Sequence, residues 1–264
     1  MSDIINIGVL GADGRMGAAV IAALASHDNA KLSVALTDSQ SPALGKAVPQ
    51  SSITYSDDIE AGLQNCDGLI DFSAPKATLK AASLMTGTRC RALVSGTTGL
   101  SQQDEATLME AASDAVILRS GNFSLGVNLL EALVERAAKS LTKGWDIEVL
   151  EMHHRHKVDA PSGTALMLGQ AAAKGRGIKL DEVQTLSREG ITGARTEGEI
   201  GFATLRGGGV IGAHEVRIAS ELEMITLSHD AFDRSVFAQG ALSAALWAQD
   251  QKPGLYNMRD VLGL

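Results

Sequence analysis

The amino-acid sequence predicts an α/β protein: a doubly wound parallel sheet in the N-terminal half, followed by an α+β domain with a mixed, largely antiparallel sheet. Short apolar runs rich in β-branched residues alternate with helical stretches in the N-terminal half. A glycine-rich turn joins the first apolar run to the first helix, and closely spaced strand patterns replace the alternation beyond Gly177. Strands that alternate with helices favour a parallel sheet, because each helix carries the chain back between parallel neighbours.

The first apolar run, residues 4–10, is typical of a strand buried on both faces. It leads into the turn Gly11–Gly17 and then into a helix expected from Ala18 to Ser26. Gly11 permits the tight turn and Gly14 lets the backbone approach a pyrophosphate, while the last glycine lets the helix pack closely on the strand. The spacing is G-x-x-G-x-x-G, not the commoner G-x-G-x-x-G, so a glycine turn without a ligand remains the alternative.

A second strand, residues 31–36, ends next to Asp38. An acidic residue about 20 positions beyond the glycine turn meets the ribose hydroxyls in the Rossmann-like dinucleotide-binding fold. A carboxylate there repels a 2′-phosphate, so the position favours NADH. The alternative is an ordinary turn residue that opens the polar loop 39–52. Arg15, inside the glycine turn, could reach a phosphate group.

The alternation then continues to Phe123. Strands are predicted over residues 68–72, 92–95 and 115–118, and helices over residues 76–85 and from Ser101 to Ser113. Pro75 suits the first turn of one helix, and Ser101 with Asp104 forms a capping box for the other. The loops 96–98 and 120–123 then lie with the glycine turn and Asp38 at the carboxyl ends of the strands, where ligands bind in such sheets.

The second half predicts a separate domain. The expected elements are an amphipathic helix over residues 129–141 packed on a core, a strand over 145–150, a helix over 165–173, strands over 199–205, 209–219 and 223–229, and a final helix over 233–249. Residues 206–209 should join the first two late strands as a hairpin. The tail 256–260 should return to the first domain, which gives residues 1–124 with 238–264 as one domain and 125–237 as the other.

A cationic run, His153–Lys157, lies between the strand predicted over residues 145–150 and the helix predicted over residues 165–173. It contains three of the six histidines of a chain whose net charge is −8. Ser162 and Thr164 follow with residue types that begin helices, and the free N–H groups of a helix start attract anions. The run therefore predicts a bound carboxylate or phosphate. A solvated surface loop is the alternative; no metal site is expected, because no second Cys/His cluster completes one.

Composition excludes several classes of protein. No apolar run of the 264-residue chain approaches the length of about 20 residues needed to span a bilayer. The isoelectric point of about 5.2 disfavours nucleic acid as a partner. Cys66 and Cys90 are expected to be free, buried thiols. Met1–Asp3 lacks the basic and apolar regions of a signal peptide, so a cytoplasmic location is expected.

Three motifs carry a resemblance to a known family. They are Gly11-Ala12-Asp13-Gly14-Arg15-Met16-Gly17, Gly96-Thr97-Thr98-Gly99 and His153-His154-Arg155-His156-Lys157-Val158-Asp159-Ala160-Pro161-Ser162-Gly163-Thr164. With these motifs the chain resembles the 4-hydroxy-tetrahydrodipicolinate reductases, also called dihydrodipicolinate reductases, over essentially its whole length. The histidine-to-threonine block is the specific one, since glycine turns occur in many dinucleotide-binding proteins.

The resemblance implies an NAD(P)H-dependent enzyme of the diaminopimelate route to lysine, which reduces a small cyclic imine dicarboxylate and releases water. It implies a dinucleotide-binding N-terminal domain and a C-terminal domain that holds substrate and builds a homotetramer. His153 would be the proton donor or acceptor and Lys157 a second donor. Substrate would be held by His154, Lys157, Ser162, Gly163 and Thr164. The cofactor would be held by Gly11, Ala12, Asp13, Gly14, Arg15, Met16, Asp38, Gly96, Thr97, Thr98, Ser120, Gly121, Asn122 and Phe123.

The sequence departs from the family pattern at Thr37-Asp38, where many relatives have Glu-Arg and the arginine can accept a 2′-phosphate. NADH is therefore the expected cofactor and NADPH the alternative, with Lys46 able to approach from the following loop. Two other functions remain open: an NAD(P)-dependent oxidoreductase acting on another small dicarboxylate or imino acid, and a dinucleotide-binding protein without catalytic activity.

Overall fold

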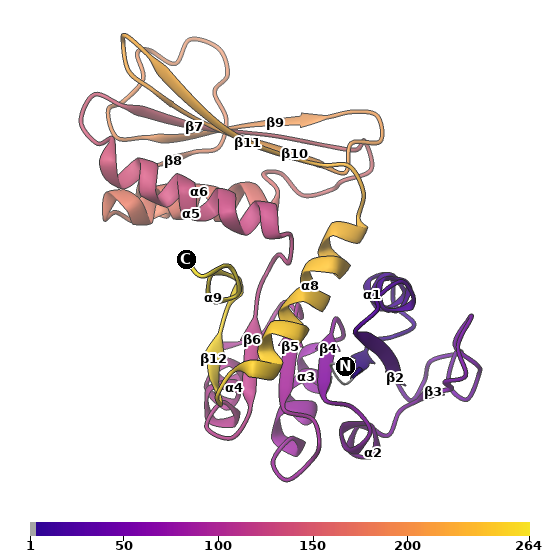
Figure 1. Cartoon of the computed structure of the whole chain (residues 1–264). Coiled ribbons are helices and arrows are strands. Elements are labelled where there is room, and N and C mark those ends of the chain that lie inside the picture. The colour runs from indigo at the N-terminus through magenta and orange to yellow at the C-terminus, as the bar shows by residue number, and fades with distance from the viewer. Residues whose placement is uncertain (1–3) are drawn as a thin grey trace. The chain divides into compact units, whose positions relative to one another are not determined.

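The computed structural model describes residues 4–264 and divides into two compact units (Figure 1). Unit 1 contains the described residues up to Ser124 together with Ser235–Leu264, and unit 2 contains Leu125–Arg234. Met1–Asp3, in which no leader pattern was found, lies outside the described residues. None of the helices between residues 4 and 264 is long and apolar enough to cross a membrane.

Unit 1 is a Rossmann-like domain built on a seven-stranded parallel sheet. Its strands are β1 (Ile5–Leu10), β2 (Ala30–Leu36), β3 (Tyr55–Ser56), β4 (Gly68–Asp71), β5 (Ala92–Ser95), β6 (Val116–Arg119) and β12 (Gly254–Tyr256), in the order β12-β6-β5-β4-β1-β2-β3. The predicted parallel sheet is confirmed, and the predicted return of the tail is explained by β12, which pairs with β6.

Helices cover both faces of this sheet. They are α1 (Arg15–Ala25), α2 (Ile59–Gln64), α3 (Pro75–Leu84), α4 (Gln102–Ala111), α8 (Ser235–Trp247), a short 3₁₀ turn (Ala248–Asp250) and α9 (Met258–Leu262). One apolar core joins β1 to α1 and α8, and a second core on the other face packs α2, α3 and α4. The sheet is therefore doubly wound, as predicted. The capping box of Ser101 and Asp104 forms at the start of α4, and Cys66 and Cys90 are buried free thiols, also as predicted.

Helix α1 begins three residues before the predicted start, which corrects the extent of the glycine turn. Gly14 is the N-cap, so Arg15 and Gly17 lie in the first turn of the helix and not in a loop. Helix α2 and strand β3 were not predicted from the sequence. Both are very short, and α2 begins where the Asp58 side chain accepts a hydrogen bond from the N–H of Ala61 at 3.0 Å.

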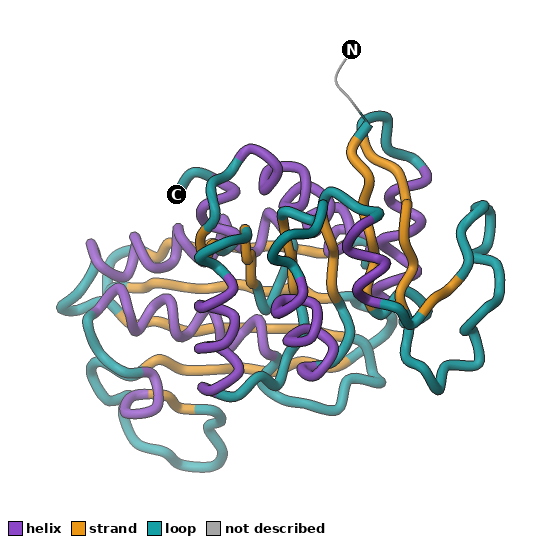
Figure 2. The backbone as a smooth tube through the Cα atoms, turned by 90° about the horizontal axis from the view of Figure 1, so that it is seen from below, coloured by secondary structure: helices purple, strands orange, loops and turns teal. Residues whose placement is uncertain are grey.

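Unit 2 is an α+β domain with one mixed sheet and two long helices. Its elements are α5 (Leu125–Ser140), β7 (Asp146–His153), α6 (Gly163–Arg176), α7 (Leu180–Val183), β8 (Gln184–Thr185), β9 (Ile200–Arg206), β10 (Gly212–Ala219) and β11 (Met224–Ala231). The strand order is β11-β10-β7-β9-β8. Figure 1 and Figure 2 show α5 and α6 side by side over one face of this sheet.

The predicted hairpin between β9 and β10 is wrong. β7 lies between these strands, antiparallel to β10 and parallel to β9, so the glycines after Arg206 carry the chain across the end of β7. There the N–H of Gly207 donates to the carbonyl of His153 at 2.9 Å. A glycine-rich run after a strand is compatible with a hairpin or with such a crossing, and only the pairing of β7 decides between them.

Helix α5 is amphipathic, but part of its predicted buried stripe is exposed. Leu130 and Val134 are buried against the sheet, whereas Leu129 and Leu133 are 42% and 46% exposed. The helix begins at Leu125, four residues earlier than predicted, and its apolar surface is wider than the face that the sheet can cover. The spacing of leucines alone could not show which of the two apolar edges packs inward.

Gly17 is required by the contact between α1 and the turn after β1. A Cβ atom at Gly17 would lie 2.2 Å from the carbonyl oxygen of Gly11, whereas one at Gly14 would lie 3.2 Å from the same atom. Replacement of Gly17 by alanine should therefore lower the free energy of unfolding by about 2–3 kcal/mol. Gly14→Ala is the matched control and should cost less than about 1 kcal/mol. Urea denaturation compares the two, and equal losses would show that the close approach does not matter.

Candidate active site

The predicted cofactor residues of unit 1 lie in the loops that follow β1, β2, β5 and β6 at the carboxyl edge of the sheet, except Arg15 and Met16, which lie in the first turn of α1. Gly11 has φ +76°, and its N–H, like that of Ala12, donates to the carbonyl of Leu36 at 2.9 Å. The turn is thereby fixed to the end of β2. No described side chain caps the start of α1, and its first turn contains no acidic residue. The amide groups of this turn suit an anion such as a pyrophosphate.

The loop after β2 is tied to the glycine turn by Asp13. The hydroxyl of Ser41 donates to the Asp13 carboxylate at 2.6 Å. The hydrogen bond from Ser41 lowers the pKa of Asp13, so this carboxylate stays charged near neutral pH. Asp38 is exposed at the same edge, and its Oδ1 accepts the N–H of Gln40 at 2.8 Å. Asp38 therefore forms a side-chain turn, which is compatible with both sequence interpretations.

Asp71, at the end of β4, is a site residue that the sequence analysis missed. Its carboxylate is fully buried and accepts hydrogen bonds from the N–H and hydroxyl of Ser73 and from the hydroxyls of Thr78, Ser95 and Thr97, at 2.5–3.0 Å. These donors come from the loop after β4, from α3, from the last residue of β5 and from the loop after β5. Asp71 thus holds the Gly96–Thr98 loop in place. Serine and threonine at strand ends were visible in the sequence, but not their convergence on one acid.

The loop after β6 is held in a similar way. The side chain of Asn122 accepts the N–H of Ser124 at 2.8 Å, and Ser120 donates to the carbonyl of Asn122 at 2.5 Å. Phe123 is buried with its ring edge-on to Phe72, with 5.6 Å between centroids. The ring of Phe123 is therefore part of the core of unit 1. Arg119 donates to the carbonyl of Thr97 at 3.0 Å and links this loop to its neighbour.

In unit 2 the cationic run does not form a single surface loop. His153 is the last residue of β7 and is only 8% exposed, while Arg155 and His156 are exposed. The strand extends three residues beyond its predicted end, because β7 is paired on both sides as far as Met152. The alternation along β7 turns His153 to the same face as Ile147 and Val149.

Glu151 is the buried partner of His153 and was also missed. Its carboxylate is 1% exposed and lies 2.6 Å from Nδ1 of His153. It accepts two hydrogen bonds from the guanidinium of Arg206, at 2.7 and 2.8 Å, and one from the N–H of Ser162 at 3.0 Å. Burial acts to raise the pKa of Glu151, but the hydrogen bonds from Arg206, His153 and Ser162 outweigh it, and the pKa lies below its ordinary value.

The N-terminus of α6 lies beside this pair. Ser162 is its N-cap and accepts the N–H of Ala165 at 3.1 Å. The helix therefore begins at Gly163, two residues before the predicted start, and Gly163 and Thr164 lie in its first turn. The hydroxyl of Ser162 also lies 3.1 Å from Nε2 of His214. Gly212 leaves space on the other side of His153: a Cβ atom at Gly212 would lie 3.2 Å from Nε2 of that histidine.

Lys157 and His154 have partners of their own. The ammonium group of Lys157 is paired with Asp159 at 2.8 Å, so a substrate carboxylate would have to share or replace that partner. Nε2 of His154 lies 3.2 Å from the guanidinium of Arg234, and burial and then the charge of Arg234 lower the pKa of His154. Within residues 4–264, no group of three or more histidine, cysteine or acidic side chains converges as metal ligands would.

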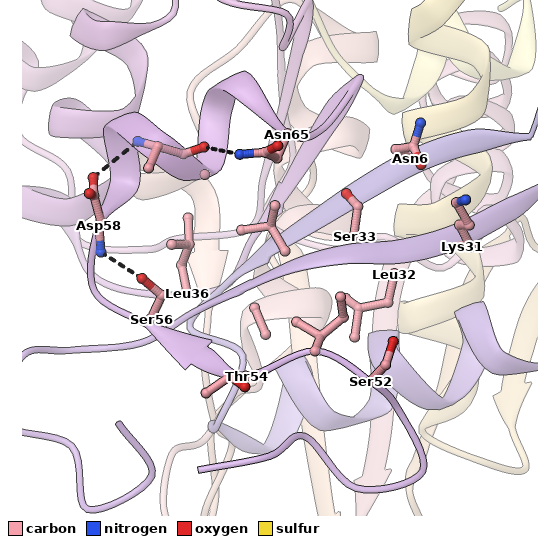
Figure 3. Close-up of a pocket in the computed structure, with 15 residues that line it drawn as sticks. Asn6, Lys31, Leu32, Ser33, Leu36, Ser52, Thr54, Ser56, Asp58 and Asn65 are labelled. Atoms are coloured by element: carbon pink, nitrogen blue, oxygen red, sulfur yellow. Dashed lines mark hydrogen bonds between the residues drawn. The ribbon is translucent and has the colours of Figure 1, made fainter. Parts of the chain in front are cut away.

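A hollow elsewhere in unit 1 is a poor candidate for the site. It runs along β2 between Lys31 and Leu36, and Figure 3 shows its polar lining residues. Asp58 accepts from the N–H of Ala61 and donates its own N–H to Ser56, while Asn65 donates to the carbonyl of Ala61. These polar groups bond to one another and do not converge on a space for a ligand. None of the predicted site residues lines this hollow.

His214 gives unit 2 a stability that depends on pH. Burial, and then the nearby His153, lower the pKa of His214 to about 4. An unfolded chain titrates histidine near pH 6.5, so the unfolded state binds more protons between these values and stability falls as the pH drops from about 6.5 to 4, by up to about 3 kcal/mol. His214→Gln should remove this contribution, and His27→Gln in unit 1 should not. Urea denaturation at pH 7.5 and 4.5 measures the difference; parallel losses in wild type and His214→Gln would contradict it.

Family models and known proteins match this chain. Residues 5–123 match the family model "Dihydrodipicolinate reductase, N-terminus", and residues 126–262 match "Dihydrodipicolinate reductase, C-terminus". The 4-hydroxy-tetrahydrodipicolinate reductase of Sinorhizobium medicae is 54% identical over 97% of this chain and 96% of its own length. The enzyme of the same name from Parvibaculum lavamentivorans is 51% identical, with 98% of each chain covered.

A solved structure shares the fold. It is a dipicolinate-bound dihydrodipicolinate reductase from Paenisporosarcina sp. TG-14, with a TM-score of 0.80 and 24% sequence identity, and the match covers 96% of this chain and 97% of the other. The match includes both the parallel sheet of unit 1 and the mixed sheet of unit 2. The two family models together match residues 5–123 and 126–262. The chain belongs to the dihydrodipicolinate reductase family.

Proposed function

We propose that this protein is an NAD(P)H-dependent reductase that converts 4-hydroxy-tetrahydrodipicolinate to tetrahydrodipicolinate and water in the diaminopimelate route to lysine. Its relatives of 50–54% identity bear the name of this enzyme. The observation that carries the proposal is the pairing of His153 with Glu151 next to the N-terminus of α6. The pairing supports the proposal because a histidine is suited to proton transfer and a helix N-terminus is suited to an anion.

The chemistry of the substrate fits these groups. Bound NAD(P)H supplies a hydride to a conjugated imine, and the negative charge so created must be taken up by a proton. His153 is proposed to supply that proton, because histidine titrates near neutral pH and its Nδ1 is already engaged by Glu151. The amides of Gly163 and Thr164 are proposed to bind one substrate carboxylate, with Lys157 and His154 as further contacts.

Unit 1 is proposed to bind the dinucleotide. The pyrophosphate would lie at the turn Gly11–Met16, the adenosine ribose at Asp38, and the nicotinamide end over the loops Gly96–Thr98 and Ser120–Phe123. NADH is the proposed preference, since the exposed carboxylate of Asp38 would repel a 2′-phosphate. These loops all lie at the carboxyl edge of one parallel sheet, which supports a single extended ligand.

Unit 2 is proposed to bind the substrate and to build a homotetramer in the cytoplasm. Both α5 and α6 pack on one face of its sheet, and within the fully described residues 125–234 no helix covers the other face. That outer face carries Leu205 and Met224, which are 48% and 54% exposed. An uncovered sheet face with apolar side chains supports association between copies of the chain.

The reductase activity should depend on His153. Purified protein is supplied with substrate freshly made from pyruvate and aspartate semialdehyde, and oxidation of NADH and NADPH is followed separately. We expect turnover with both, and kcat/KM about tenfold or more in favour of NADH, which corresponds to about 1.4 kcal/mol. His153→Gln should lower kcat by about 100- to 10,000-fold with a much smaller change in KM.

Asp38→Asn is the control for the cofactor preference and should bring the two kcat/KM values closer together. Equal or better turnover with NADPH by the wild type would contradict the role of Asp38 and leave the reductase assignment intact. Cofactor binding without turnover would favour the alternative of a dinucleotide-binding protein. Turnover of another imino acid, with none of this substrate, would favour a different oxidoreductase.

The cofactor loops should loosen when Asp71 is replaced by asparagine. Asparagine has one acceptor oxygen, and its amide group would oppose the hydroxyls that now donate to Asp71, so Asp71→Asn should weaken NADH binding by about tenfold or more. Asp67→Asn is the matched control: Asp67 precedes the same strand and binds Asn6 and Arg89 at the opposite end of the sheet. Fluorescence titration with NADH should show a wild-type Kd for Asp67→Asn. If both variants bind NADH equally weakly, the effect of Asp71→Asn comes from general instability.

A further inference from the structure

We infer that Glu151, held by Arg206, is the positioning residue that keeps a proton on Nδ1 of His153 and leaves Nε2 to exchange a proton with the substrate. The inference rests on the proposed role of His153 and adds what controls it. Glu151 touches no substrate group in this scheme and acts through the histidine. The same carboxylate also binds the N–H of Ser162, so it fixes the start of α6 relative to His153.

The ionised state of Glu151 determines which nitrogen of His153 carries the proton. An ionised carboxylate only accepts hydrogen bonds, so the 2.6 Å contact between Glu151 and His153 requires a proton on Nδ1. Glu151 is ionised because Arg206 and the other donors hold its pKa below the ordinary value against the effect of burial. Neutral His153 then has its lone pair on Nε2, and protonated His153 releases the proton from Nε2 without disturbing the bond to Glu151.

Arg206 orients this carboxylate and balances its charge. Its guanidinium occupies both oxygens of Glu151 and donates to the carbonyl of Asp159 at 2.7 Å. The loop that contains Lys157 is thereby tied to the same ion pair. Because Arg206 already neutralises Glu151, neutral His153 is not left beside an uncompensated buried charge, and it can gain and lose a proton during turnover.

The other groups around His153 do not compete for this role. The ring of His214 lies edge-on to that of His153 with 5.1 Å between centroids, and its low pKa of about 4 keeps it neutral near pH 7. Lys157 is paired with Asp159, and the hydroxyl of Thr204 lies 3.4 Å from Glu151. Of these neighbours, only Glu151 contacts Nδ1 of His153 at hydrogen-bonding distance.

Glu151→Gln reverses the donors and acceptors with little change of shape. The guanidinium of Arg206 needs an acceptor, so the amide oxygen should turn toward it and the amide nitrogen toward Nδ1 of His153. The histidine should then move its proton to Nε2. We expect kcat to fall by about 100-fold or more, in line with the effect of a wrong histidine tautomer in other enzymes, while KM changes by less than about tenfold.

The tautomer is measured directly by long-range ¹H–¹⁵N NMR of protein labelled at histidine, with the His153 signals assigned by their loss in His153→Gln. At a pH where His153 is neutral, the wild type should show the Nδ1–H form and Glu151→Gln the Nε2–H form. An Nε2–H form in the wild type would overturn the inference, and this measurement needs no variant of Glu151 to fold. An unchanged tautomer or an unchanged kcat in Glu151→Gln would overturn it as well.

Glu148→Gln is the matched control. Glu148 lies on the same strand and pairs with Arg188 and Arg195 at 2.9–3.0 Å, but its side chain points to the opposite face of the sheet. This variant should keep the wild-type tautomer and kcat. Failure of the proposed function would be distinguishable, because the wild type would then show no reductase turnover while its His153 tautomer can still be read by NMR.

Discussion

A charged carboxylate can be buried only where donors surround it, and unit 2 is organised by that requirement at Glu151. The Glu151 carboxylate accepts hydrogen bonds from Arg206 of β9, from His153 of β7 and from the N–H of Ser162, the N-cap of α6. Removing Arg206 would leave an unpaired charge in the interior, which is far more costly than a lost surface contact. The positions of His153 and of the N-terminus of α6 therefore both depend on the Glu151 carboxylate.

Unit 1 meets the same requirement by different means. Asp71 is surrounded by hydroxyl and amide groups, whereas Glu151 has a guanidinium. Asp71 is bound by neutral donors and ties together the loops after β4 and β5, at the edge where the cofactor is proposed to bind.

Periodicity and turn chemistry were sufficient to predict most of the architecture. The alternation of apolar runs and helices gave the parallel sheet, and Ser101 and Ser162 marked helix starts that the structure contains. These are local effects, visible over a few residues. Glu151 and Asp71 could not be recognised in this way, because their partners lie up to 55 positions away. The predicted hairpin between β9 and β10 was wrong for the same reason, because their order in the sheet depends on long-range pairing with β7.

The chain leaves unit 1 after Ser124 and returns to it at Ser235, which has a consequence for biosynthesis. The core that contains Ile7 and Val9 is completed by Ala241 and Leu242 of α8, and β6 gains β12 as its outer neighbour. On the ribosome these late segments emerge only after every residue of unit 2. Unit 2 can therefore fold while unit 1 still lacks α8 and β12. The N-terminal half is then the longer-lived nascent intermediate, and the one that most needs protection from aggregation during translation.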